Sequence, residues 1–228
     1  MRRAVMRSSM RLQNAARWVL AACLLWMLGT AQSVAATLSL DDAVRVHDAW
    51  PHVRVLSDPE RRIAADEALQ RLAEFKPPTS PHAGMGFRND ALWFHLPVAV
   101  PADSDGRWVL EIDYALLNRV EVFIAHGGRA EHAATMGSLL PFRDRPLGSR
   151  TPAVMLDFPR GQTTDLLFRI DTRSSVIVPV KFLKPAAFHA RANHEFLLQG
   201  VLIAIGLCLL VSSFFSASAR RRSNASWR

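Results

Sequence analysis

Three arginines and one phenylalanine lie close together between residues 141 and 150. They are Phe142, Arg143, Arg145 and Arg150, in the segment PFRDRPLGSR. Guanidinium groups form paired hydrogen bonds with planar carboxylates and phosphates, and a neighbouring aromatic ring can stack on a sugar or a base. We therefore predict that this segment forms part of the rim of a ligand-binding pocket, with Arg145 as its key residue. The alternative is that its arginines bond internally and hold the loop against the domain.

The other reactive residues form no recognisable catalytic or metal-binding motif. His126 and His132 do not have the spacing of zinc ligands, and His194-Glu195 lacks the second histidine of a zinc-protease helix. The sequence contains no Gly-x-Ser-x-Gly motif and no phosphate-binding glycine loop. We therefore expect histidines scattered over the surface, no catalytic residue, no metal site and no cofactor.

Two alternating runs within Arg107–His126 are the elements that would position this loop. Apolar residues at every second position alternate mostly with charged ones, which is typical of strands that bury one face. The apolar positions are Trp108, Leu110, Ile112 and Tyr114, followed by Val120, Val122 and Ile124. Glu111 and Asp113 share the other face of the first strand. We expect these acids to pair with arginines, the choices being Arg119, Arg145 and Arg169.

Further short strands are expected on both sides of this central pair. The candidates are Thr37–Leu40, His52–Leu56, Asp90–Val100, Ala153–Phe158, Asp165–Thr172 and Val176–Leu183. Many short strands separated by turns indicate an antiparallel β-sandwich or jelly roll. Two roles are possible for the aromatic residues Trp93, Trp108 and Tyr114, which belong either to the core or to a ligand platform. Trp108 lies on the apolar face of its strand, which favours the core.

Two segments are expected to lie outside the sheets. Ser57 and Glu60 have capping-box spacing, so a short helix is expected to start there and to end before the prolines at Pro77 and Pro78. The segment from Gly127 to Leu140 is expected to be turn and loop.

The net charge of +8 comes from the two ends of the chain. Nine arginines lie there without an accompanying acid, namely Arg2, Arg3, Arg7, Arg11, Arg17, Arg220, Arg221, Arg222 and Arg228. The segment between them contains all 20 acidic residues and is close to neutral. A nucleic-acid-binding surface is therefore not expected.

The first 36 residues have the three parts of a secretory signal peptide. A basic region ends at Arg17, an apolar core extends from Trp18 to Leu28, and small residues precede Thr37. The apolar core is short for a membrane span, so we predict export with cleavage after Ala35 or Ala36. The alternative is an uncleaved membrane anchor.

Near the C-terminus, Phe196–Phe215 contains no charged residue. As a helix it would be about 30 Å long, which matches the hydrocarbon core of a bilayer. Arg220–Arg222 follow it and predict a cytoplasmic C-terminus. The alternative is a buried core helix. We thus divide the chain into a signal peptide at 1–36, a periplasmic domain at 37–194, a transmembrane helix at 195–217 and a basic cytoplasmic tail at 218–228.

Several stretches together carry a resemblance to a known family. They are LWF at Leu92–Phe94, WVLEIDYALLNRVEVFI at Trp108–Ile124, PFRDRPLGSR at Pro141–Arg150, LLFRIDTRSSVIVPVKF at Leu166–Phe182 and PAAF at Pro185–Phe188, followed by an apolar helix. Their order and spacing resemble the second type of extracellular domain in the bacterial seven-transmembrane receptors with diverse intracellular signalling modules, the 7TMR-DISM family.

The resemblance implies a periplasmic, jelly-roll-like β-sandwich that senses a small-molecule ligand, and carbohydrate-like ligands are suggested for the family. Relatives place this domain before seven membrane helices and an output domain, whereas the sequence here reaches Arg228 after one. We therefore expect the ligand-sensing part of an inner-membrane receptor, either truncated or acting with a membrane-embedded signalling partner. The alternative is a membrane-tethered subunit that binds carbohydrate or another envelope component without signalling itself.

Overall fold

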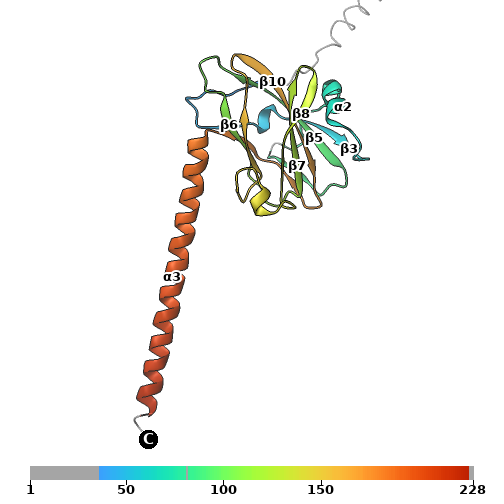
Figure 1. The fold of residues 1–228 in the computed structure, drawn as a ribbon. Helices are drawn as coiled ribbons and strands as arrows, with labels where there is room; N and C mark the ends of the chain where they lie inside the picture. Colours follow the sequence, from blue (N-terminus) through green and yellow to red (C-terminus); the bar gives the residue numbers. More distant parts are fainter. Residues whose placement is uncertain (1–35, 81, 226–228) are drawn as a thin grey trace, which may run out of the picture. The chain divides into compact units, whose positions relative to one another are not determined.

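The computed structural model describes residues 36–80 and 82–225, with the side chains of 192–198 and 214–225 left out of that description. This part of the chain is mainly β, as predicted, and ends in one long helix (Figure 1). The predicted signal peptide at 1–36 lies outside the described residues except for its last residue, Ala36.

Six strands form the larger sheet. Their bounds are Leu38–Ser39 (β1), Arg54–Asp58 (β3), Ala91–Val100 (β5), Arg119–His126 (β7), Arg129–Met136 (β8) and Gln162–Asp171 (β10). The order is β1-β5-β10-β7-β8, with β3 as a further partner of β5. The central strand β10 runs antiparallel to both β5 and β7. Within the described strands only β1 runs parallel to its partner, β5.

Four antiparallel strands form the second sheet, in the order β2-β12-β6-β9. Their bounds are Val46–Asp48 (β2), Arg107–Ile112 (β6), Ala153–Asp157 (β9) and Val180–Leu183 (β12). A separate small pair joins β4 (Gly84–Gly86) to β11 (Val176–Ile177). The two runs predicted as a central pair, β6 and β7, therefore lie in different sheets and do not pair with each other.

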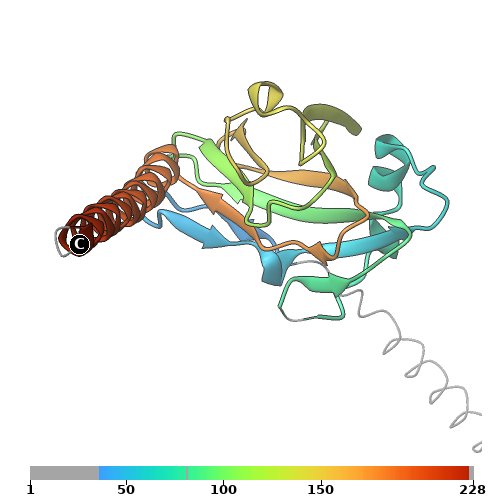
Figure 2. The same cartoon turned by 90° about the horizontal axis from the view of Figure 1, so that it is seen from below.

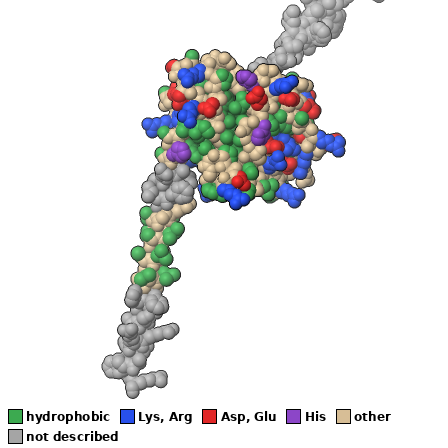
Figure 3. Space-filling model, in the orientation of Figure 1, with side chains coloured by type: hydrophobic (Ala, Val, Ile, Leu, Met, Phe, Trp, Pro, Cys, Tyr) green, Lys and Arg blue, Asp and Glu red, His purple; other side chains and the backbone are tan. Residues whose placement is uncertain are grey.

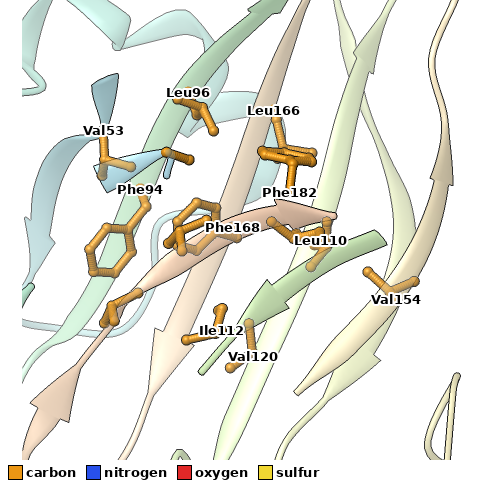
Figure 4. Packing of buried hydrophobic residues seen from close by; sticks show 14 of the residues in the cluster. Val53, Phe94, Leu96, Leu110, Ile112, Val120, Val154, Leu166, Phe168 and Phe182 are labelled. Carbon is orange, nitrogen blue, oxygen red and sulfur yellow. The ribbon is translucent and has the colours of Figure 1, made fainter. Parts of the chain in front are cut away.

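The main core lies between the two large sheets, which form layers in Figure 2. Phe94 of β5 and Phe168 of β10 face each other in the register and their rings stack 4.8 Å apart. Leu110 of β6 and Phe182 of β12 supply the opposite layer, and Figure 4 shows these side chains converging. The alternation of apolar residues in β5, β6, β7 and β10 thus places one set of side chains inside a two-layer sandwich.

The other face of the larger sheet is also partly buried, which corrects the expectation of strands packed on one side only. Trp93 and Leu167 lie on that outer face, in a second apolar cluster. The cluster is completed by the short helix α2 (Ala65–Gln70), the 3-10 helix η2 (Leu72–Glu74) and Phe75. Trp93 is therefore a core residue and not a ligand platform, since only 1 % of it is exposed.

The predicted helix start at Ser57 is wrong. Ser57 and Asp58 belong to β3, and α2 begins only at Ala65. The side chain of Asp58 accepts hydrogen bonds from the backbone N–H groups of Arg62 and Ile63, so it stabilises the turn before the helix. The capping-box spacing was misleading because the serine hydroxyl bonds to Asp90 instead of the helix backbone.

The expected loop from Gly127 to Leu140 is also wrong, because most of it forms β8. Gly127 and Gly128 both have positive φ, 57° and 78°, and make a tight hairpin from β7. Such a two-residue turn favours glycine at both positions. The strand itself was missed because its sequence, RAEHAATM, is poor in β-branched residues and therefore lacks the usual strand signal.

The last element is helix α3 (Pro185–Ala225), which contains the predicted transmembrane segment. Its side chains from Val201 to Val211 are exposed and largely apolar, and Figure 3 shows them along the described part of the helix. Within the described residues, no helix meets the length and apolarity needed to cross a membrane. The remaining surface in Figure 3 has acidic and basic side chains interspersed, in keeping with the neutral charge predicted for the domain.

Candidate functional site

The predicted arginine loop joins β8 to β9 and contains the 3-10 helix η3 (Phe142–Asp144). Backbone hydrogen bonds fold it tightly, including one of 3.2 Å from Gly148 N–H to the carbonyl of Arg145. Gly148 has a positive φ of 55°, and a Cβ there would meet the Phe142 ring at 3.8 Å. The loop is therefore a folded unit and not an open connection.

Arg145 lies at the centre of this loop. Its Nε donates to the carbonyl of Leu140 at 3.3 Å, and its Nη1 donates to the carbonyls of Ser149 and Arg150 at 3.1 and 3.3 Å. The guanidinium also lies 5.6 Å from the centre of the Phe142 ring. The cavity beside Arg145 measures about 10 Å³, which is room for one water molecule at most. The side chain thus holds the loop together.

The other predicted site residues lie on the outside of the loop. Phe142 is 60 % exposed, and the side chain of Arg143 is 87 % exposed beside Asp144. Arg150 is exposed as well, and its carbonyl is one of those that bind Arg145. The fold therefore brings Phe142 and Arg145 together and leaves Phe142 and Arg143 accessible to a ligand.

The end of the loop is joined to helix α3 through a buried acid. Glu111 of β6 is fully buried, and its Oε1 accepts hydrogen bonds from the Thr151 hydroxyl at 2.8 Å and from the Arg191 guanidinium. Its Oε2 has no partner among the described atoms. The expectation that Glu111 pairs with Arg119, Arg145 or Arg169 is wrong; Asp113 instead pairs with Lys181 at 2.9 Å.

An apolar contact reinforces this link. Phe188, in the first turn of α3, is buried against Val109 and Leu183 on the outer face of the smaller sheet. Leu147 of the arginine loop packs on the same cluster. The loop and the start of the helix therefore share two sets of contacts, one ionic at Glu111 and one apolar at Phe188.

The expectation of surface histidines is wrong in part. His95 is buried, and its Nε2 lies 2.8 Å from an oxygen of Asp165 on the neighbouring strand. Its ring also contacts that of Phe75, and its buried Nδ1 has no hydrogen-bond partner among the described atoms. Among the residues covered by the structure, no cluster of His, Cys, Asp or Glu has a geometry that could hold a metal ion.

A groove beside β3 was not predicted from the sequence. It has a volume of about 480 Å³, within the range of small-molecule sites. Its walls come from β3, the segment 74–79, β4, Arg88 and the start of β5. Figures 1 and 2 both show β3 and α2 on the side of the β domain away from the first turn of α3. The prolines at Pro77 and Pro78 were the only sequence signal, and they indicated a linker.

Residues 50–184, more than half of the chain, match the 7TMR-DISM extracellular 2 domain. The chain belongs to this family. A 7TMR-DISM extracellular domain is the sensor part of a receptor, which implies a ligand and a membrane context for the protein. The family resemblance inferred from the sequence is thereby confirmed over the β domain. A comparison with curated proteins found no match.

The solved structures that this chain matches include larger glycosidases. The 7TMR-DISM chain is 14 % identical to β-glucuronidase from Ruminococcus gnavus, with a TM-score of 0.37 over 62 % of this chain and 29 % of that one. The complex of that enzyme with an N1-substituted uronic isofagomine gives 13 % identity and a TM-score of 0.39, over 65 % and 31 %. The chain spans less than a third of these enzymes, and such distant likeness assigns no activity.

Proposed function

We propose that this chain is the membrane-anchored periplasmic ligand-sensing domain of a bacterial signal-transduction receptor. The observation that carries the proposal is the match of residues 50–184 to a receptor extracellular domain. The described fold is in keeping with it, because a rigid two-layer sandwich with exposed loops is a common scaffold for recognition. We also propose that the strands of this domain are connected as in a jelly roll.

The proposed topology rests on the two ends of the chain. A signal peptide at 1–36 would export the domain at 37–194, a helix at 195–217 would anchor it in the inner membrane, and the arginine-rich tail at 218–228 would remain in the cytoplasm. The exposed apolar side chains between Val201 and Val211 support the anchor, since such a surface is unfavourable in water.

A reporter fused after Arg228 tests this topology. A fluorescent protein that matures only in the cytoplasm should be active in that fusion, and alkaline phosphatase, which needs export, should be inactive. Active phosphatase at this position would contradict the proposed anchor and orientation. As a control, phosphatase fused at Leu183, within the β domain, should be active.

The arginine loop is our proposed ligand contact, and its residues have two different roles. Phe142, Arg143 and Arg150 would contact a small-molecule ligand from the pocket rim, while Arg145 positions them through its three carbonyl contacts. A ligand that moves this loop would also disturb Thr151 and Leu147. Both contact residues that bind the start of α3, so the loop offers a short path to the membrane helix.

Two matched variants separate these roles once a ligand is found. Arg143→Ala should weaken binding by about 1.5–3 kcal/mol and leave the melting temperature unchanged, since its side chain is exposed. Arg145→Ala should lower the melting temperature, because three backbone carbonyls lose their donor. Calorimetric titration and thermal melts of both variants measure these effects. Unchanged affinity in Arg143→Ala would remove this residue from the site.

A further inference from the structure

We propose that the groove beside β3 binds a small organic carboxylate with an apolar body. The biological meaning of this ligand rests on the proposed sensing function. The binding site itself is argued from the geometry of the groove alone. Its volume of about 480 Å³ suits a molecule of roughly ten to twenty heavy atoms.

The floor of the groove is apolar. Val55 of β3, Met85 of β4 and Leu92 of β5 line it, and all three belong to or pack against the main core. These side chains are held by the sandwich, so the floor is rigid and needs little ordering when a ligand binds. Burial of a hydrocarbon chain or ring on this floor supplies the apolar part of the binding energy.

The acids Glu74 and Asp90 at the groove each pair with an arginine of the protein. The carboxylate of Glu74 accepts two hydrogen bonds from Arg71, at 3.0 and 2.7 Å, and Arg71 donates a third to Glu67 at 2.9 Å. The carboxylate of Asp90 accepts two from Arg88, at 2.8 and 2.7 Å, and one from the Ser57 hydroxyl. The hydrogen bonds from Arg88 lower the pKa of Asp90 to about 2, so this acid stays ionised and paired at neutral pH.

Lys76 is the second cation that lines the groove. The Lys76 ammonium makes no hydrogen bond or ion pair within the part of the chain that the structure describes, although its residue lines the groove. Arg88 uses Nε and Nη2 for Asp90, which leaves the donors of Nη1 available on the same groove. One ammonium and a partly used guanidinium complement a single negative charge, so the favoured ligand is a monoanion.

The backbone holds Lys76 in place for this role. Its N–H and C=O both pair with Val55 of β3, at 3.0 and 2.8 Å, and Pro77 and Pro78 restrict the chain that follows. The charged group is therefore mounted on a strand edge directly beside the apolar floor. A carboxylate at Lys76 would place its apolar body over Val55 and Met85.

The test uses the full chain in lipid nanodiscs and two probes of the same shape, 3-phenylpropanoate and the neutral 3-phenylpropanamide. Ligand-observed NMR titrations should show that the carboxylate binds and that the amide binds about 10-fold more weakly. Lys76→Met keeps the aliphatic stem and removes the charge, and should reduce carboxylate affinity about 10-fold without changing that of the amide. Lys181→Met makes the same change at a lysine of β12 that does not line the groove, so it is the matched control and should have no effect.

Three results would overturn the inference. The first is equal affinity for the acid and the amide. The second is an unchanged affinity for the acid in the Lys76→Met variant, provided that this variant melts at the same temperature as the parent chain. The third is no binding of the acid at concentrations up to about 20 mM. Loss of binding only in a further variant, Arg143→Met, would place the carboxylate at the arginine loop and refute the groove site while supporting the proposed sensing function. Conversely, an active phosphatase fused after Arg228 would refute the proposed topology and leave carboxylate binding at the groove unaffected.

Discussion

Replacing Arg191 with methionine should destabilise the protein by about 3–5 kcal/mol, because it leaves the buried carboxylate of Glu111 without its cation, although the Arg191 side chain itself is 35 % exposed. Glu111 is fully buried, and the Thr151 hydroxyl would be its only remaining donor among the described groups. Methionine has a similar length to arginine and preserves the aliphatic packing, so the change reports on the charge. Urea unfolding of the full chain in a non-denaturing detergent, followed by tryptophan fluorescence, measures the free energy of unfolding.

A neighbouring ion pair provides the control. Asp113, two residues from Glu111, pairs with Lys181, and the two side chains are 38 % and 33 % exposed. Lys181→Met should therefore cost only about 0–1 kcal/mol. Adding Glu111→Gln to Arg191→Met should restore part of the lost stability, because a buried amide is less costly than an unpaired carboxylate. If Arg191→Met costs no more than Lys181→Met, the buried link between β6 and α3 does not exist as described.

The fold makes three further predictions. Trp108→Ala should cost about 3–5 kcal/mol in chemical denaturation, because the ring is fully buried, and a loss below 1 kcal/mol would exclude it from the core. Gly137→Ala should cost about 2–4 kcal/mol, since φ is +127° and a Cβ would lie 2.4 Å from a backbone carbonyl oxygen. Its control is Gly127→Ala, which has open space around the added Cβ and should cost about 1–2 kcal/mol in the same assay. The pKa of Asp90 is about 2 in the folded state, below its ordinary 3.8, so its pairing with Arg88 stabilises the fold above about pH 4 and is lost as the pH falls towards 2. Asp90→Asn should therefore cost about 1–2 kcal/mol at neutral pH, after allowing for solvent screening, and almost nothing near pH 2; an equal cost at both pH values, measured by urea midpoints, would contradict this.

The sequence by itself was sufficient for the strands with strong alternation and for the family. β5, β6, β7 and β10 were predicted because a strand's two faces are encoded by neighbouring residues, so the pattern is local. For the same reason Trp108 could be assigned to the core from its position in the alternating pattern alone. The arginine loop was also recognised, because its residues are contiguous in the chain.

The tertiary structure decided everything that depends on which elements meet. Glu111 carries the same local signal as Asp113, yet one is buried against Arg191 and the other is a partly exposed partner of Lys181. Only the docking of α3 on β6 makes this difference. The burial of Trp93 required α2 to cover the outer face of the larger sheet, and the groove beside β3 required segments up to 37 residues apart to converge, from Val55 to Leu92. Strand alternation specifies which residues share a face, but it does not specify what will cover that face, because the covering element is set by contacts between distant parts of the chain.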